Sequence, residues 1–234
     1  MTAPAHVSES PIKQRLSKSK IAAFESCPRK LWLQVHRPSL AEFDPDTLAL
    51  FKLGHQVGEL ARWRHPDGVL VAEDHRDIPG ALATTAQLIA AREQRPIFEA
   101  AFERDGVVVR ADILKPDGWG GWELIEVKNS LGVKPYQIRD LASQYWVIHG
   151  NPVCISSTMI RHVDRRVTAT KLTSSSIGFV DVDVTAKAQA LLPRQEVIIA
   201  AARNTLAGPE PEVRPGPHCL RPRCEFREHC GANM

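Results

Sequence analysis

The sequence predicts an α/β fold in which a small mixed sheet is flanked by helices. Three successive segments, at about 96–103, 106–115 and 121–128, read as strands bounded by turn residues. Asp105 and Gly106 supply a favoured hairpin turn between the first two of them. A helical pattern and a fourth strand-like segment follow along the chain, and strands connected through helices are typical of α/β folds.

Two short helices are predicted near the start of the chain. Ser17 is suited to cap the first helix, which carries Ile21 and Phe24 on one face and ends near Cys27. Pro28 suits the first turn of the second helix, "PRKLWLQVH". The two helices are therefore expected to meet at Cys27.

A longer helix is predicted over residues 44–64, with Asp44 or Asp46 as its cap. Its apolar residues recur at helical spacing, which indicates a buried face. They are Leu50, Leu53, Val57, Leu60 and Ala61. A probable strand at 68–73 and a helix starting at Pro79 precede the central strands.

The remaining elements follow the three central strands. A helix over 134–150 is predicted to bury one face against the sheet. The residues expected on that face are Ile138, Leu141, Tyr145 and Ile148. Strands are expected at 151–163 and 176–184, and then a helix over 185–206 that Pro193 bends.

One domain is expected for residues 16–234, because a chain of 234 residues that is 43% hydrophobic can bury one sizeable core. The expected parts are a disordered N-terminus at 1–15, a helical part at 16–95, a core at 96–206, a linker at 207–217 and a cysteine-rich tail at 218–234.

The composition is that of a soluble protein. The net charge is +3 and the isoelectric point is near 8.6, which permits a nucleic-acid partner without requiring one. The longest apolar run, "VIIAAA", has six residues, and the N-terminus lacks the apolar core of a signal peptide. We therefore expect a cytoplasmic protein without a membrane partner.

An acidic site is predicted where two of the central strands form a hairpin. Glu126 and Lys128 lie two residues apart in "LIEVKNS", so they share one face of a strand. Asp112 lies near the end of the preceding strand, so the hairpin can bring its carboxylate to Glu126. Two carboxylates suit Mg²⁺ or Mn²⁺, and Lys128 can then act on a phosphate. Taken alone, the pattern also fits a solvent-facing ion pair.

The surrounding residues make the pattern more specific. The order of His55, Glu99, Asp112, "EVK" and Gln144 resembles the PD-(D/E)XK nuclease core, in particular its RecB-type branch. Ala111 stands where many members have proline, and Ile148 stands where the family usually has a tyrosine. The resemblance implies a nuclease domain that cuts DNA with a divalent ion.

The resemblance also implies roles for these residues. His55, Asp112, Glu126 and the Val127 carbonyl are expected to bind the metal, and Lys128 to act in catalysis. Gln144 is expected to hold the Lys128 side chain or the DNA. Weaker candidates are Glu99 and Asp140, which can instead pair with nearby Arg or Lys residues, and Tyr145, which follows Gln144 directly.

Four of the five cysteines form a second predicted site. Cys27 stands near the start, and the last sixteen residues contain Cys219, Cys224 and Cys230. Four thiolates hold either zinc or an iron–sulfur cluster. One remote cysteine with a C-terminal trio resembles the CRISPR-associated exonucleases and the AddB-type nuclease domains, which implies a [4Fe–4S] cluster, with zinc or [2Fe–2S] as alternatives. Cys154, between two apolar residues, is predicted to be an inert core residue.

The expected activity is exonuclease cleavage of single-stranded DNA or DNA ends. Basic residues over 160–171 can track a phosphate backbone, and the chain lacks a P-loop, so any helicase partner is a separate chain. The resemblance also implies CRISPR adaptation proteins as partners, while repair, phage recombination and CRISPR spacer acquisition are all open as pathways. Two rival hypotheses are a catalytically silent DNA-binding or assembly module and a redox-sensing DNA-binding protein.

Overall fold

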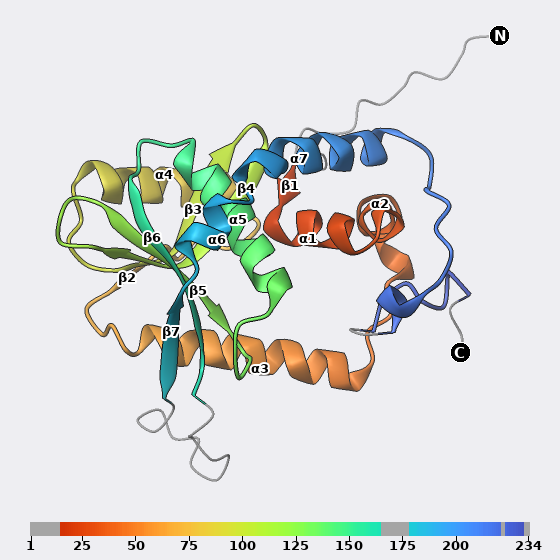
Figure 1. Cartoon of the computed structure of the whole chain (residues 1–234), viewed down its shortest axis with the longest axis horizontal. Helices are drawn as coiled ribbons and strands as arrows, with labels where there is room; N and C mark the ends of the chain where they lie inside the picture. The colour runs from red at the N-terminus through yellow and green to blue at the C-terminus, as the bar shows by residue number, and fades with distance from the viewer. Residues whose placement is uncertain (1–14, 165–177, 221–222, 232–234) are drawn as a thin grey trace.

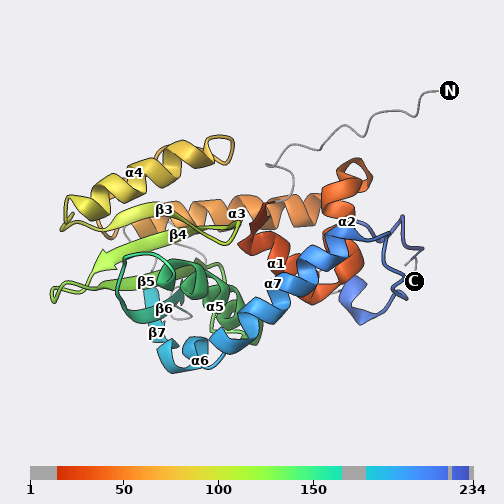
Figure 2. The ribbon, with the colours of Figure 1, turned by 90° about the horizontal axis from the view of Figure 1, so that it is seen from above.

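A seven-stranded mixed sheet forms the centre of the fold (Figures 1 and 2). The computed structural model describes residues 15–164, 178–220 and 223–231. The strands are β1 (Leu16–Ser17), β2 (Val69–Leu70), β3 (Ile97–Arg104), β4 (Val107–Pro116), β5 (Trp122–Lys128), β6 (Ile155–Val163) and β7 (Phe179–Asp183). The path β2-β3-β4-β5-β6-β7 is continuous, and β1 pairs with β4.

The helices flank this sheet. They are α1 (Lys18–Ser26), α2 (Pro28–His36), α3 (Pro45–Arg62), α4 (Ile78–Ala90), α5 (Pro135–His149), α6 (Thr185–Gln189) and α7 (Leu192–Ala207), with 3-10 turns η2 (Pro38–Leu40) and η3 (Pro217–Cys219). Helices α1, α2 and the C-terminal segment gather at one end of the molecule, away from β6 and β7 (Figure 1). Helix α1 runs from the edge of the sheet, after β1, to Cys27 at this end of the molecule.

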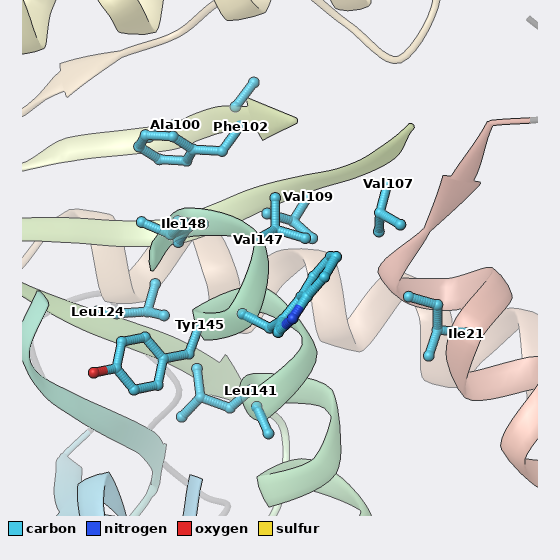
Figure 3. Close-up of a cluster of buried hydrophobic side chains, with 14 of the residues drawn as sticks. Ile21, Ala100, Phe102, Val107, Val109, Leu124, Leu141, Tyr145, Val147 and Ile148 are labelled. Atoms are coloured by element: carbon cyan, nitrogen blue, oxygen red, sulfur yellow. The ribbon is translucent and has the colours of Figure 1, made fainter. Parts of the chain in front are cut away.

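The main core lies between α5 and the sheet. Leu141, Tyr145 and Ile148 of α5 point toward Val109 of β4 and Leu124 of β5 (Figure 3). Alternate residues of the same strands face the other way, since side chains alternate along a strand. A smaller cluster on that second face contains Ala61 of α3 with Phe98, Ile113 and Ile125. The two faces thus hold α5 and α3 on opposite sides of the sheet.

The pairing of β4 leaves a notch along one of its edges. β3 pairs with β4 along nearly its whole length, so β1 and β5 must share the opposite edge. β1 pairs with Val107 and Val108, whereas the β5 register begins at Ile113. Between them lies a short stretch of β4 that ends at Asp112. This notch brings the start of α1 and the end of β5 to the same part of β4.

Most predicted elements are confirmed, including the caps. Ser17 accepts a hydrogen bond from the Lys20 amide at the start of α1, and Asp44 accepts one from the Thr47 amide at the start of α3. The turn between β3 and β4 has positive φ at both Asp105 (48°) and Gly106 (67°), as the favoured hairpin turn requires.

Four expectations about the fold are wrong. The strand at 68–73 is only two residues long, because just Val69 and Leu70 pair with β3. The helix over 185–206 is two helices, since α6 ends before Leu192 and Pro193 opens a new helix instead of bending one. Leu50 and Leu53 are exposed rather than buried, and so is Cys154.

The exposure of Leu50 and Leu53 has a simple geometric reason. The N-terminal half of α3 extends beyond the sheet, and only the C-terminal half, with buried Val57 and Ala61, lies against it (Figure 1). Cys154 is exposed because it precedes β6 and so lies outside the covered part of the sheet. Among the described residues, no helix combines the length and hydrophobicity needed to cross a bilayer.

Candidate active site

The carboxylate of Asp112 closes the notch in β4. The backbone pairing of β4 with β5 ends at Ile113 and Ile125, and Asp112 Oδ2 then accepts a hydrogen bond from the Val127 amide at 2.7 Å. The Asp112 side chain therefore bonds to β5 just beyond the last backbone pair between the two strands. Burial, followed by repulsion from Glu126, raises the pKa of Asp112 to about 7. The two carboxylates predicted to share a site are thus close enough to interact strongly.

The Glu126 carboxylate is surrounded by three side-chain donors. Its side chain is 2% exposed, and its two oxygens receive hydrogen bonds from Lys18, Lys128 and Gln144. Burial opposes ionisation, but the attraction of Lys18 and Lys128 outweighs it and lowers the pKa of Glu126 to about 2. Glu126 is therefore held as a carboxylate, while the neighbouring Asp112 titrates near neutrality.

Lys128 lies between two carboxylates. Its Nζ is 2.8 Å from Glu126 Oε1 and 3.2 Å from Asp140 Oδ2. Burial opposes its charge, but these partners raise the pKa of Lys128 above its usual value, so the ammonium form persists. Asp140 of α5 therefore holds the lysine beside Glu126.

Gln144 has a different partner from the one predicted. Its Nε2 donates to Glu126 Oε2 at 2.6 Å, so it orients the carboxylate rather than the Lys128 side chain. The Gln144 side chain is fully buried, and its Oε1 has no hydrogen-bond partner among the described residues. A buried glutamine held in this way keeps Glu126 in one orientation.

Glu99 lies on β3, at the position next to Asp112 of the neighbouring strand β4. The β3–β4 register pairs Phe98 with Ile113 and Ala100 with Ala111, and it skips Glu99. Glu99 has a φ of 57°, a left-handed conformation that is rare for a residue with a side chain and is common at functional sites. Its carboxylate pairs with Arg110 at 3.2 Å and Arg62 at 3.5 Å. The predicted pairing with arginines is confirmed.

A pocket of about 340 Å³ opens above these groups. Its lining includes His55, Glu99, Asp112, Glu126, Val127 and Lys128. Helix α3 supplies one wall, and two small residues, Gly54 and Gly58, leave room beside His55. Predicted residues from α3, β3, β4 and β5 therefore share one pocket, whereas Asp140, Gln144 and Tyr145 of α5 do not line it.

The donor set suits a hard divalent ion. Two neighbouring carboxylates suit Mg²⁺ or Mn²⁺, and the raised pKa of Asp112 comes first from burial and then from repulsion by Glu126, both of which a bound cation would offset. In the described part of the chain, however, no three His, Cys, Asp or Glu side chains are placed together closely enough to hold an ion. The assignments of His55 and the Val127 carbonyl as ligands therefore stay predictions, although both residues line the pocket.

Tyr145 belongs to the core. It is 5% exposed, its ring packs in the α5 cluster, and its hydroxyl accepts a hydrogen bond from Gln189 at 3.3 Å (Figure 3). The neighbouring Trp146 is also 5% exposed, and the guanidinium of Arg104 lies over its ring. Neither aromatic side chain is presented for contact with a ligand.

Lys18 contacts the candidate site although the sequence did not indicate it. Its Nζ lies 2.8 and 3.0 Å from the two oxygens of Glu126, which is 108 residues away. A lysine in the first turn of a helix carries no local signal of this contact. Only the pairing of β1 with β4, which begins at Leu16 and Val107, places it in the notch.

The second predicted site is at the far end of α1. Cys27, Cys219, Cys224 and Cys230 line one small cavity of about 20 Å³, together with Arg29 and Lys30. Cys27 is the residue between α1 and α2, and Glu225 in the tail pairs with Lys30 at 2.9 Å. The predicted gathering of the two ends of the chain is therefore present.

In the part of the chain that the structure describes, the four thiols line one cavity but are not grouped closely enough to hold a metal ion, so the metal centre stays a prediction. Burial raises the pKa of Cys224 and of Cys230, so a bound cation is needed to keep them as thiolates. The cavity has room for about one water-sized group, so a cluster would require the thiols to move apart. The choice between [4Fe–4S], [2Fe–2S] and zinc stays open on this geometry.

In the described part of the basic segment 160–171, Arg161 is buried and paired, so it is not available to bind a phosphate backbone. Arg161 is 7% exposed and donates to both carboxylate oxygens of Asp181 at 2.7 Å. Residues 165–171 lie outside the described residues, as does most of the N-terminus expected to be disordered. Residues 210–216, in the predicted linker, form neither helix nor strand.

No protein-family model matches the sequence, and no curated protein matches it significantly. Solved structures with similarity include SSO0001, at 13% identity and a TM-score of 0.46 over 98% of this chain and 90% of that chain. An alkaline exonuclease (LHK-Exo) from Laribacter hongkongensis has 13% identity and a TM-score of 0.47 over 83% and 88%. LHK-Exo in complex with dAMP gives 14%, 0.45, 84% and 89%. At these values the similarity does not by itself assign a function to the chain.

Proposed function

We propose that this protein is a metal-dependent nuclease that hydrolyses phosphodiester bonds of DNA, as an exonuclease on single strands or ends. One observation carries the proposal. The carboxylates of partly buried Asp112 and buried Glu126 line one pocket, and the ammonium group of Lys128 lies 2.8 Å from Glu126 in the same pocket. Two acids and a fixed lysine are the groups needed to bind a cation and to stabilise charge on a phosphate.

The residues of the chain have distinct roles in this mechanism. Asp112 and Glu126 would hold Mg²⁺ or Mn²⁺, which supplies an activated water and neutralises phosphate charge when bound. Gln144 keeps Glu126 in its orientation. Lys128, positioned by Asp140, donates to the phosphate oxygen on which charge grows as water attacks phosphorus. His55, on the α3 wall, is the proposed third protein ligand.

The first test is cleavage of labelled DNA with and without a divalent ion. We expect wild-type protein to shorten linear single-stranded DNA in Mg²⁺ or Mn²⁺ and to be inactive after addition of a chelator in excess of the ion. Circular single-stranded DNA is the matched substrate, since an exonuclease leaves it intact. Cleavage that persists without any divalent ion would contradict the proposal, and tight binding without cleavage would favour the binding-module hypothesis.

We propose further that Cys27, Cys219, Cys224 and Cys230 hold a structural metal centre, with [4Fe–4S] as the first candidate and zinc or [2Fe–2S] as the others. The support is their common cavity, in which Cys219 is buried and the other three cysteines are partly buried. Such a centre would close a loop of almost the whole chain. By the chain-entropy model for a disulfide, that closure stabilises by on the order of 4–5 kcal/mol.

The second test is the absorption spectrum and metal content of anaerobically purified protein. We expect a brown protein with iron and acid-labile sulfide, and loss of both colour and iron in Cys27→Ala. Cys154→Ala is the matched control, because Cys154 is exposed and lies outside the cavity. It should keep the colour. A colourless protein that contains one zinc ion would overturn the cluster and retain the metal centre.

The resemblance stated above also predicts partners, namely a separate helicase or CRISPR adaptation proteins. These partners are predictions from the resemblance of the motifs. They add nothing to the assignment of the pocket.

A further inference from the structure

Lys18 is placed in the pocket by two independent elements. β1 ends at Ser17, whose pairing with Val108 fixes the chain beside β4. Ser17 is also the cap of α1, so Lys18 begins the helix directly after that pairing. The backbone of Lys18 is therefore held on both sides, and its side chain reaches the end of β5 across the notch.

The ammonium group of Lys18 contacts both oxygens of Glu126. Its Nζ lies 2.8 Å from Oε1 and 3.0 Å from Oε2, so it occupies the position between the two oxygens that a bidentate cation would take. Lys128 also reaches Oε1, and Gln144 also reaches Oε2. Each oxygen of Glu126 thus has two donors. An ion that binds Glu126 must take the place of at least one of them.

Lys18 is the donor that a metal ion would displace. Gln144 is buried in α5, and Lys128 has a second carboxylate partner, Asp140, that holds it where it is. The Lys18 side chain is 24% exposed and forms an ion pair with Glu126. When an ion binds Glu126, Lys18 can therefore move toward solvent, and the buried Glu126 carboxylate still has a positive partner.

We propose that Lys18 is the internal counter-ion of Glu126, which a divalent ion displaces on binding, so that Lys18 sets the metal affinity of the carboxylate site. This inference rests on the proposed function. In the metal-free protein, the Lys18 ammonium stabilises the folded state by neutralising a buried carboxylate. In the presence of a divalent ion, the same positive charge competes with the ion for Glu126 and repels it.

The test is Mn²⁺ binding, followed by the electron paramagnetic resonance of free Mn²⁺, without DNA. Mn²⁺ is chosen because it prefers oxygen ligands to the thiols of the other site. We expect Lys18→Met to lower the Kd for Mn²⁺ by about tenfold or more, since it removes a unit positive charge a few ångströms from the ion. Lys18→Arg keeps the charge and should stay within about threefold of wild type. Lys20→Met is the control, since Lys20 Nζ bonds the Arg15 carbonyl instead.

Thermal unfolding gives an independent readout. Lys18→Met should have a lower Tm than wild type without added metal, and the difference should close or reverse in saturating Mn²⁺. A Kd for Lys18→Met equal to or weaker than that of wild type would overturn the role of Lys18 alone. If Lys18→Met does not fold, a Kd of Lys18→Arg more than tenfold tighter than wild type would overturn it. Absence of Mn²⁺ binding by wild type would instead overturn the proposed metal site.

Discussion

Asp112→Asn is expected to abolish cleavage and, at the same time, to make the metal-free protein more stable at pH 8. The asparagine side chain has the same shape, and its carbonyl oxygen can still accept the hydrogen bond from the Val127 amide. It removes one of the two carboxylates that are proposed to bind the ion, so we expect cleavage to fall by at least about 10³-fold. A folded but inactive protein is therefore the expected product.

The stability gain follows from the raised pKa of Asp112. With a value of about 7 in the folded protein against an ordinary 3.8, the folded state keeps a proton that the unfolded state loses. Stability from this group therefore falls as the pH rises from about 4 to 7, and the full penalty is present above pH 8. Asp112→Asn removes it, and we expect a gain of about 1–3 kcal/mol at pH 8, because a buried amide still carries some desolvation cost.

Urea unfolding at pH 5 and pH 8, without added divalent ion, measures this effect. The gap between Asp112→Asn and wild type should be larger at pH 8 than at pH 5. Glu123→Gln is the matched control, since Glu123 lies on the same β5 strand but pairs with Lys115 outside the pocket. It should retain cleavage and change stability by less than about 1 kcal/mol. An Asp112→Asn protein that still cleaves DNA would remove Asp112 from the mechanism.

The sequence predicted the acidic site because the relevant spacing is local. Glu126 and Lys128 share a strand face, and the hairpin fixes Asp112 beside them, so three residues follow from strand periodicity and one turn. Lys18 and Asp140 differ in this respect. The Lys18 contact spans 108 residues and depends on a two-residue strand, which has no periodicity to detect. Asp140 was a candidate for pairing with a nearby Arg or Lys, but that its partner is Lys128 is seen only when α5 is docked on the sheet.

The wrong expectations also concern contacts between segments that are distant in the sequence. Apolar periodicity predicts that a helix has one hydrophobic face, but it does not say how far the sheet extends beneath that face. Leu50 and Leu53 continue the pattern of Val57 and Ala61 past the end of the sheet and are therefore exposed. Gln144 was predicted to hold Lys128 or the DNA, but it donates to Glu126 instead of Lys128, because its helical position does not select between these two neighbours; its contact with DNA stays a prediction.

Lys128→Met should separate catalysis from metal binding. The methionine side chain fills most of the volume of lysine but has no charge and no donor for a phosphate oxygen. We expect cleavage to fall by about 10²–10³-fold, the usual cost of losing one donor to a developing charge. Mn²⁺ binding should be retained, because Asp112 and Glu126 remain. Glu126 also keeps its contact with Lys18, so the loss of stability should stay near 1–3 kcal/mol.

The control for this variant is Lys115→Met. Lys115 also pairs with a glutamate of β5, at 2.8 Å, but outside the pocket, so its loss removes an equivalent ion pair without touching the site. It should cleave DNA at the wild-type rate. Single-turnover cleavage by Lys128→Met at the wild-type rate would show that the lysine only balances the charge of Glu126 and Asp140. Loss of Mn²⁺ binding together with cleavage would show that it organises the site for the ion, because catalysis then fails before phosphate chemistry begins.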